Sequence, residues 1–510
     1  MNARPRLASI CLFLNLLVIC AMAICFAVLP AAIIVCNLRD PGLWRDQTPR
    51  IAFSLHRTIT PAFEAWAKTR VASGRAATVS ISNISGTEWP VFGSVFYLWA
   101  TEALQDAWEQ DPSQSGKPPK EYALGAIEAA TGLVLDPNHA SWVKQHWGAD
   151  YMSHENLFYR YALIAAMTSH YRLTGDATHL PLLRTLVDAL ASEIDASEFG
   201  LLDDYPGQCF PADVMAAIAC IRHTDRFLGT DHSPFAARAL RAFEGKAAGK
   251  YGLPPYMADR LAGRPCDPSR GSSNSYIGNL APQLWPGPAR EWYAAYTNNF
   301  WQYRWFAWGF REFPKDREDK NWHVDVDAGP CISGHGIAAS AFGAGAARAN
   351  GRFDHAYPLT TEILAASWPL PTGRLLVPRV LSNAADAPLL GEVCILFNLT
   401  RRTHEDFPVE AASALPPIVY IMIAAYVGVG ALALYAGLRS FLAMRRLRFP
   451  VPMLQTIVWA VFVAAGICLM ALQHSRAGFI VFLLSQFLPR QWPWLTALSS
   501  RFRTGQTSNT

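Results

Sequence analysis

Charged residues are scarce in this chain of 510 residues: they make up 16% of it, whereas hydrophobic residues make up 51%. That balance excludes an intrinsically disordered chain and a coiled coil, and the length excludes a small disulfide-stapled scaffold. The 44 lysines and arginines are scattered except for one short cluster, and the formal net charge is only +4. The chain therefore lacks the basic footprint of a nucleic-acid-binding protein, and we expect no nucleic-acid partner.

Cysteine pairs at metal-ligand spacing are also missing, because no CxxC motif occurs. Of the ten cysteines, half lie in or beside apolar runs at the chain ends and half in the middle segment. The odd number in the middle segment leaves at least one thiol free. The pattern indicates neither a disulfide framework nor a zinc site, and we expect a site without metal or cofactor.

Long uncharged runs lie near both ends of the chain. Residues 7–36 form an apolar run longer than the roughly 20 residues that a membrane-spanning helix needs. Further runs at 418–438 and 453–473 flank a loop at 439–450 that contains several arginines, and an interfacial segment and tail follow at 477–510. We expect three transmembrane helices; a cleaved signal peptide is the alternative for the first, but its length favours a retained anchor.

Arginines set the expected orientation of these helices. Short loops rich in arginine stay on the cytoplasmic side, which places both the 439–450 loop and the N-terminus, with Arg4 and Arg6, inside the cell. Both assignments put residues 40–415 on the other side. We therefore expect a multi-pass protein of the cell (inner) membrane whose main domain faces the periplasm or exterior and whose partner is the lipid bilayer.

Helical periodicity dominates residues 40–415. The predicted helices are Val91–Gln110, Glu121–Ala130, Asn156–Leu173, Leu180–Ile194, Pro211–Leu228, Phe235–Gly245, Ala289–Trp308, His335–Ala349 and Thr360–Ser367. Strand signals are few, with Thr78–Ser82 and Leu375–Val380 the best candidates. No repeat of fixed period occurs, which argues against an open solenoid and favours a closed ring of paired helices, an all-α toroid. The small residues of Ile337–Ala349 suit the close packing of its inner ring.

The loop Leu202–Asp213 is the first candidate site. Asp203, Asp204, Tyr205 and Cys209 crowd in front of a helix. Adjacent carboxyl groups can separate their pKa values into an acid and a base, and a thiol at a helix N-terminus can be activated as thiolate. The alternative interpretation is a solvated turn in which Asp213 or its neighbours cap the helix.

Two further polar loops follow. In Cys266–Asn279, Arg270, Asn274 and Tyr276 are candidates for binding a polar ligand, although a flexible surface loop is an equal alternative. In Asn321–His335, Asp325 and Asp327 would lie on one face of a strand, where they would form an acid–base pair or bind a cation. The oxygen ligands and the glycine of a calcium loop are missing, so we expect no metal there.

Glu88, beside Trp89 at the expected start of an aromatic-rich helix, is the fourth candidate. Apolar surroundings raise the pKa of a carboxyl group, as an acid catalyst requires, but a first-turn acid that interacts with the helix dipole is an equal alternative. Trp301, Tyr303 and Trp305, with Trp308, are expected along one helix. A cavity lined by such rings would accept a terpene-like or a sugar-like ligand.

The middle of the chain resembles the linalool dehydratase/isomerase family. The residues that carry the likeness are Glu155-Asn156 before a helix that ends in Leu-Thr-Gly at 173–175, then Asp203, Tyr205, Gln208 and Cys209, and finally Gly336–Phe342. The resemblance implies an exported (α/α)6 barrel, homo-oligomers that build the site, and cofactor-free dehydration or isomerisation of an allylic terpene alcohol. Gly200 and Ala162 stand where that family has its first active-site Cys and its catalytic His.

These observations lead to a functional hypothesis with two alternatives. The first is a membrane-anchored lyase or isomerase in which Asp203 or Glu88 protonates the leaving hydroxyl of a small-molecule substrate, and Cys209 or Asp204 takes up a proton. The second is a carbohydrate-active enzyme, either a glycoside hydrolase or a lyase of the cell envelope, with two carboxylates across a cleft. The third is a non-catalytic envelope scaffold, which would have the mouth of the barrel filled.

Overall fold

The computed structural model describes residues 13–14, 16–244, 248–317, 322–412, 414–447, 452–471 and 475–487. Parts of several predicted segments lie outside these residues. They are the start of the 7–36 span, Gly245, the last residues of the 439–450 loop, the last residues of the 453–473 span, and the tail from 488. The structure is 66% helix and 8% strand, which confirms the mostly helical prediction. It divides into a central unit, 37–366 with 381–419, and a terminal unit of the remaining residues.

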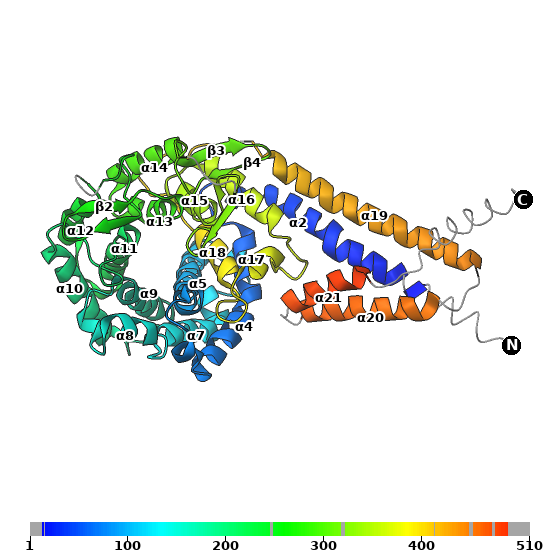
Figure 1. Ribbon diagram of the computed structural model, residues 1–510, viewed down its shortest axis with the longest axis horizontal. Helices are drawn as coiled ribbons and strands as arrows, with labels where there is room; N and C mark the ends of the chain where they lie inside the picture. Colours follow the sequence, from blue (N-terminus) through cyan, green and yellow to red (C-terminus); the bar gives the residue numbers. More distant parts are fainter. Residues whose placement is uncertain are drawn as a thin grey trace, which may run out of the picture. The chain divides into compact units, whose positions relative to one another are not determined.

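Six helices of the central unit contact one another in a closed succession (Figure 1). These inner helices are α5 (Ile84–Gln110), α9 (Leu157–Thr174), α11 (Pro211–Leu228), α13 (Gly271–Leu280), α15 (Ile337–Ala349) and α18 (Leu390–Leu399). Each contacts the next, and α18 contacts α5 again. The side chains on their shared interior therefore come from helices that are far apart in sequence.

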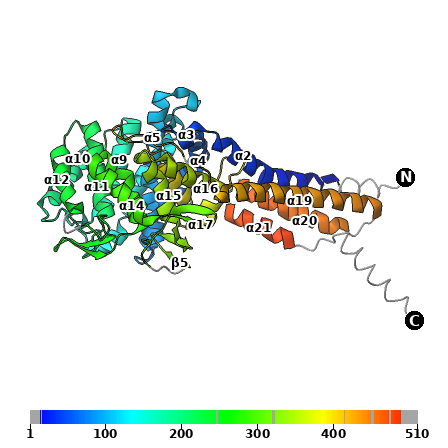
Figure 2. The ribbon, with the colours of Figure 1, turned by 90° about the horizontal axis from the view of Figure 1, so that it is seen from above.

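A second set of helices covers this succession from outside. The outer helices are α4 (Arg50–Ala72), α7 (Leu124–Leu135), α10 (Leu180–Ala196), α12 (Ser233–Ala239), α14 (Pro286–Phe300) and α16 (Phe353–Ala366). Each contacts at least one inner helix, and α10 contacts both α9 and α11 (Figure 2). In α10, Leu183, Leu186, Val187 and Leu190 are buried at spacings of three and four, so one apolar face packs inward.

Short elements connect these helices. They are α3 (Pro41–Trp44), α6 (Pro119–Tyr122) and α8 (Ser141–Trp147), with the strands β1 (Met257–Asp259), β2 (Arg264–Asp267), β3 (Trp301–Arg304), β4 (Ala307–Phe310), β5 (Trp322–Asp325), β6 (Gly329–Ile332) and β7 (His335–Gly336). A further short helix, α17 (Leu376–Leu381), belongs to the terminal unit except for its last residue. The strands pair antiparallel as β1–β2, β3–β4 and β5–β6–β7.

The first inner helix begins earlier than predicted. Asn83 caps α5, so Pro90 lies inside the helix instead of marking its start. A proline there removes the hydrogen bond that its N–H would give to the carbonyl of Gly86. Arg70 of α4 donates from Nη2 to that carbonyl at 2.6 Å, which replaces the missing bond and lets the helix continue. As a result Glu88 belongs to a helix that faces the interior.

Small residues bring α13 and α15 together, as the Ile337–Ala349 composition predicts. A Cβ atom added to Gly278 would lie 2.9 Å from the Cβ of Ala346, and one added to Gly271 would lie 2.9 Å from the Cβ of Ala339. Both distances are too short for two carbon atoms. Glycine at these positions is therefore required for the observed helix separation.

The predicted helix Ala289–Trp308 is wrong in its second half. α14 ends at Phe300, and residues 301–310 form the β3–β4 hairpin with Trp305 in a left-handed conformation at its tip. Trp301, Tyr303 and Trp305 recur every second residue, which is the period of a strand, and aromatic residues favour strands. These aromatics therefore do not line one helix.

Both predicted strands are also wrong. Residues 78–82 follow a short 3-10 helix, Arg75–Thr78, without pairing to a strand, and Leu375–Val380 contributes to α17. In α17, Pro378 lies in the first turn, where its missing N–H costs no helical hydrogen bond. In both segments β-branched residues indicated strands, but no partner strand is available to pair with them.

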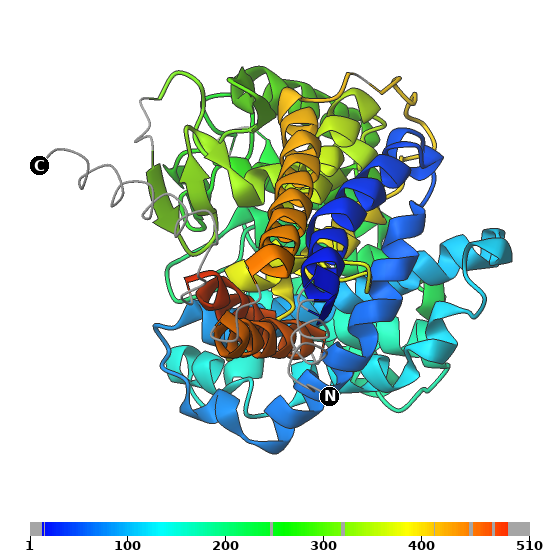
Figure 3. The ribbon, with the colours of Figure 1, turned by 90° about the vertical axis from the view of Figure 1, so that its right-hand side faces the viewer.

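The terminal unit contains α2 (Leu29–Leu38) and the preceding π-helical turn Ile24–Val28, α19 (Pro417–Leu447), α20 (Pro452–Ala471) and α21 (Ser475–Phe487). Close contacts of Gly430 with Ala27 and of Gly466 with Gly478 let these helices pack side by side, as Figure 3 shows for α2 (blue) and α19 (orange). In the described part of the chain, Leu16–Leu38 and Pro417–Arg439 are long and apolar enough to cross a membrane. Val461–Met470 in α20 is a shorter apolar stretch, so the third span stays a prediction.

Candidate functional site

Four carboxyl groups from separate elements of the central unit act on one another through their charges; Asp204 is buried, Glu88 and Asp213 are partly exposed, and Asp327 is exposed. Glu88 comes from α5, Asp204 from the loop before α11, Asp213 from the first turn of α11, and Asp327 from the turn between β5 and β6. The charges of Asp213 and Asp327 act on Glu88, and those of Asp213 and Glu88 act on Asp204. We call these four residues the acidic cluster.

Glu88 has no charge-compensating partner. Burial, followed by the charges of Asp327 and Asp213, raises the pKa of Glu88 well above its usual value. Within the described residues, no group donates a hydrogen bond to its carboxyl, although the side chain keeps some accessible surface. Burial and the neighbouring charges therefore favour the protonated form of Glu88, which has a proton to donate.

Asp204 and Asp213 complete an acid–base set with Glu88. Burial, the charge of Asp213 and that of Glu88 raise the pKa of Asp204, although the backbone N–H of Phe210 donates to its Oδ2 at 3.3 Å. Burial raises the pKa of Asp213 to about 7, against the opposing effect of the Tyr161 hydroxyl, which donates to its Oδ1 at 3.1 Å. Asp213 thus changes charge near neutral pH, beside carboxyl groups whose pKa values are also raised.

Asp327 is held by an aromatic and ionic framework. The hydroxyl of Tyr256 donates to its Oδ2, and the ring of Tyr256 lies 3.8 Å below the guanidinium of Arg270. Arg270 also pairs with Asp325 at 3.2 Å, and Asp325 accepts from the backbone N–H groups of Asp327 and Ala328. Asp325 therefore shapes the turn that carries Asp327, and only Asp327 reaches the cluster.

Asp203 and Asp204 have different roles, although the sequence places them side by side. Asp203 accepts from Gly207 N–H at 2.8 Å and pairs with Arg260 at 3.2 Å. Arg260 in turn pairs with Glu155 at 3.0 Å. Neighbouring side chains of an extended segment point in opposite directions, so when Asp204 faces the cluster Asp203 faces the ion pair. Asp203, a predicted acid, holds the loop instead.

Tyr205 and Cys209 lie beside the cluster. The ring of Tyr205 contacts Trp142 and His146 of α8, with ring centres 5.8 and 4.7 Å apart. Cys209 is fully buried, and this burial, with the charges of Asp204 and Asp203, raises the pKa of its thiol well above the usual value. The thiolate suggested by its position before α11 is therefore disfavoured. The backbone carbonyl of Cys209 accepts a hydrogen bond from the Ala258 N–H at 3.0 Å, and this bond joins β1 to the loop.

The two ligand-binding candidates on α13, Asn274 and Tyr276, also have different surroundings. The side-chain NH2 of Asn274 donates hydrogen bonds to the carbonyls of Pro254 and Arg270, whereas its Oδ1 is buried without a hydrogen-bond partner among the described residues. The hydroxyl of Tyr276 is likewise unpartnered in the described part of the chain and lies close to that of Tyr161. Of the two, Tyr276 faces the interior beside Asp213.

An aromatic wall continues from the cluster into the interior. It consists of Phe92 and Phe96 of α5, Phe158 of α9, Tyr276 of α13, Phe342 of α15 and Phe397 of α18. Phe92 lies 4.8 Å from Phe158, and Phe96 lies 4.8 Å from Phe397, between ring centres. Glu88, Phe92 and Phe96 follow at spacings of four along α5, so acid and rings share one helix face.

The two positions that depart from the resembled family are structurally constrained. Gly200 has φ +70°, and a Cβ there would lie 3.3 Å from the Cβ of Ala242. A cysteine at this position would be strained in this conformation. Ala162 is buried in α9. The chain therefore has neither a Cys nor a His at these two positions.

Sequence reasoning missed three members of the site. Asp213 was expected only as a helix cap, and Tyr161 and Tyr256 carried no local signal. Glu312 was also missed: it accepts from Ser272 N–H and hydroxyl at 3.0 and 2.8 Å at the start of α13, and burial raises its pKa to about 8. An acidic residue directly after Pro-Ala at a helix start was the one signal that favoured Asp213.

Comparison with known proteins adds no assignment: no family model matches the chain, and no curated protein matches it. Among the described residues, no group of three or more His, Cys, Asp or Glu side chains is arranged to hold a metal ion. The acidic cluster and the aromatic wall are thus the features on which a function has to be argued.

Proposed function

We propose that the chain is a membrane-anchored (α/α)6-barrel protein similar to the linalool dehydratase/isomerase family. It acts as a lyase or isomerase that removes or moves the hydroxyl group of an allylic, terpene-type alcohol by acid–base catalysis. The main domain faces the periplasm or exterior, and homo-oligomers are the expected assembly. The observation that carries this proposal is the acidic cluster, in which neutral carboxylic acids adjoin a wall of aromatic rings.

The chemistry needs an acid, a base and a shelter for positive charge. Glu88, or Asp204 beside it, donates its proton to the substrate hydroxyl. The C–O bond then breaks, water departs, and an allylic cation remains. Aromatic faces such as that of Phe92 stabilise the cation. Asp213 in its ionised form then removes a proton from the carbon next to the cation, which gives a diene. Return of the water to the other end of the allyl system, with transfer of one of its protons back to the carboxylate of Glu88 or Asp204, gives the isomeric alcohol instead.

The aromatic wall favours this substrate class over a carbohydrate. Five of its six members are phenylalanines, whose side chains offer no hydrogen-bonding group to sugar hydroxyls. A carbohydrate site would need polar groups along the same surface to orient the sugar ring. A pair of neighbouring carboxyl groups is common to both reactions and does not discriminate between them.

The proposal is tested with the purified full-length protein in detergent. We would incubate it with an allylic tertiary terpene alcohol and with its primary isomer, and analyse dienes and isomeric alcohols by gas chromatography. Time-dependent product that disappears in Glu88→Gln is the expected result. The Asp203→Asn protein serves as the matched control, because Asp203 is equally acidic but ion-paired outside the cluster.

Thermal unfolding separates the alternatives. A ligand present at about 100 times its dissociation constant adds about 2.7 kcal/mol of stability. Stabilisation by allylic alcohols supports the proposal. Stabilisation by oligosaccharides, with no response to alcohols, would contradict it and favour a carbohydrate-active enzyme. A protein that responds to neither and yields no product would favour the envelope scaffold.

A further inference from the structure

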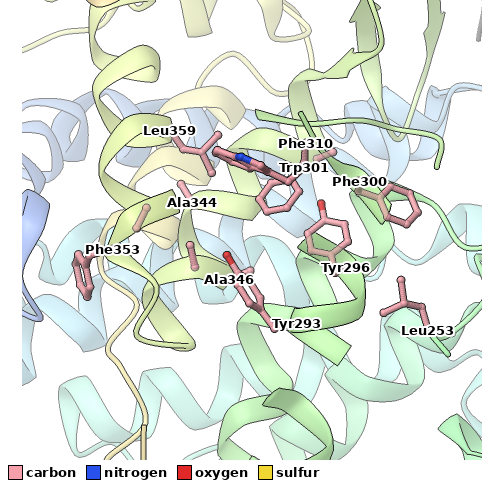
Figure 4. Close-up of a cluster of buried hydrophobic side chains, with 13 residues drawn as sticks. Leu253, Tyr293, Tyr296, Phe300, Trp301, Phe310, Ala344, Ala346, Phe353 and Leu359 are labelled. Carbon is pink, nitrogen blue, oxygen red and sulfur yellow. The ribbon is translucent and has the colours of Figure 1, made fainter. Parts of the chain in front are cut away.

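The β3–β4 hairpin has a buried base and a solvent-exposed tip. At its base Trp301 and Phe310 are opposite each other in the register and their ring centres lie 5.0 Å apart. Both belong to a buried cluster with Tyr296 of α14 and Leu359 of α16 (Figure 4). The ring of Phe310 stacks on that of Tyr296 at 4.3 Å. This packing holds the base of the hairpin firmly.

The tip is unusually apolar for an exposed turn. Trp305 is 75% exposed, Tyr303 67% and Phe306 44%. The ten residues from Trp301 to Phe310 include no acidic side chain, and their one charged residue is Arg304. The guanidinium of Arg304 lies 5.9 Å from the Trp305 ring centre and donates to the carbonyl of Ser333 at 2.9 Å.

The hairpin tip is bound to the beginning of an apolar helix. The backbone N–H of Ile418, in the first turn of α19, donates to the carbonyl of Phe306 at 2.9 Å. From Pro417 to Arg439 this helix has 23 residues, and they include an 18-residue window with a mean hydropathy of 2.1 in which only 17% of the residues are buried. At about 1.5 Å per residue it is about 34 Å long, close to the hydrocarbon thickness of about 30 Å.

From these contacts we infer that the β3–β4 tip is a membrane-interface anchor, in which Trp305 and Phe306 insert among phospholipid headgroups beside the point where α19 enters the bilayer. A helix that just spans the hydrocarbon has its first turn at the interface, so a turn bonded to Ile418 is at headgroup depth. Trp and neighbouring basic residues are the side chains that this region favours. Arg304 is placed to meet lipid phosphate.

Continuity with α19 favours lipid over a protein partner. The outward side chains of α19 are themselves apolar, with Val429 59% and Leu432 68% exposed. A lipid bilayer would cover these residues and the hairpin tip together, whereas a soluble protein bound to the tip would leave α19 bare. The anchor is independent of the reaction proposed above, because none of its residues belongs to the acidic cluster.

Spin labels on the full-length protein in phospholipid nanodiscs test this inference. Trp305→Cys is labelled in a background in which the exposed native Cys36, Cys266 and Cys468 are serine. Two further proteins carry the label at Val429→Cys, in the middle of α19, and at the native Cys266 on β2. Relaxation by oxygen, which dissolves in lipid, is compared with relaxation by a water-soluble nickel chelate. Thermal unfolding checks that each labelled protein is folded.

The ratio of oxygen to nickel accessibility is expected to be high at 429, severalfold lower at 305, and severalfold lower again at 266. An equal ratio at 305 and 266 would overturn the anchor, since the tip would then lie in water. Low accessibility to both reagents at 305 would also overturn it, because a second copy or another protein would then cover the tip. A low ratio at 429 would overturn it as well, since α19 would not be inserted.

Discussion

Glu88 and Glu102 lie about four turns apart on the same interior face of α5, and burial affects both. At Glu88 the next neighbours are other carboxyl groups, and the pKa is raised. At Glu102 burial again acts to raise the pKa, but the charge and hydrogen bond of His223 outweigh it, so the pKa is lowered. His223 Nε2 lies 2.8 Å from Glu102 Oε2. The same residue type in one helix is thus a neutral acid at one end and an ion-paired base at the other.

Under the proposed function, this difference distinguishes a proton donor, Glu88, from a structural carboxyl group, Glu102. A buried charge is expensive unless it is paired, and the Glu102–His223 pair links α5 to α11 near their C-terminal ends. The acidic cluster near the opposite ends has no such compensation. Uncompensated carboxyl groups lower the stability of a folded protein, and they are retained where a proton has to be transferred. The Phe96 region of the aromatic wall lies between the two ends.

The largest expected effect is on turnover. Glu88→Gln should reduce conversion of the allylic alcohol by about 10²- to 10⁴-fold, the usual contribution of a general acid. The melting temperature should stay the same or rise, because glutamine is isosteric with the neutral acid that Glu88 is at neutral pH. Product formation by gas chromatography and thermal unfolding measure the two responses.

Asp203→Asn is the matched control for this substitution. It removes an ion pair with Arg260 and should lower the melting temperature while keeping most of the turnover. If Asp203→Asn abolished turnover and Glu88→Gln did not, the assignment of the two carboxyl groups would have to be reversed.

The next largest effect is expected on the free energy of unfolding, when Phe96 in the middle of α5 is replaced. Phe96 is 2% exposed and contacts the rings of Phe397, Phe342 and Tyr276. Phe96→Ala leaves a cavity in this wall and should cost about 3–5 kcal/mol of unfolding free energy, measured by denaturant titration. The exposed Phe306→Ala should change it by less than about 0.5 kcal/mol. Equal effects would show that the wall is not packed.

Local patterns predicted some elements well. The boundaries Pro211–Leu228 agree with α11, because a proline begins the helix and Gly229 ends it in a left-handed conformation. The end of α9 at Gly175 follows the same rule. Such signals lie within one turn of the boundary and need no tertiary information. The aromatic hairpin was mispredicted because its period of two was read together with the helix before it.

Features that depend on contacts between distant segments could not be predicted from the sequence. The start of α5 depends on Arg70 of another helix, which replaces the hydrogen bond that Pro90 removes. In the same way, alternation separates Asp203 from Asp204, but the ion pair of Asp203 with Arg260 is a contact that the local sequence does not reveal. Glu88 was a candidate from its local sequence and stays a prediction, whereas Asp213 and Asp327, whose charges act on it, come from segments far apart in sequence.

A smaller effect is expected at the paired end of α5. Glu102→Gln removes the charge that stabilises His223 and leaves a neutral amide in a buried place. Because His223 is partly exposed, we expect a loss of about 1.5–3 kcal/mol, the usual range for hydrogen bonds to charged groups. Denaturant titrations of Glu102→Gln, His223→Gln and the double variant form a thermodynamic cycle. Strict additivity of the two single losses would contradict the pairing.

The last effect is the pH dependence of stability at Asp213. Its pKa is raised from 3.8 to about 7 in the folded protein, so between those values the folded state holds a proton that the unfolded chain has lost. The free energy of unfolding should therefore fall as pH rises through this window and level off above it. One proton corresponds to at most about 1.4 kcal/mol per pH unit, and less near the folded pKa, where Asp213 is half ionised. Asp213→Asn lacks this titration, so its stability should fall less steeply than that of the wild type between about pH 5 and about pH 7. Parallel curves for the two proteins would mean that Asp213 is ionised throughout and that the cluster holds its protons on Glu88 and Asp204 alone.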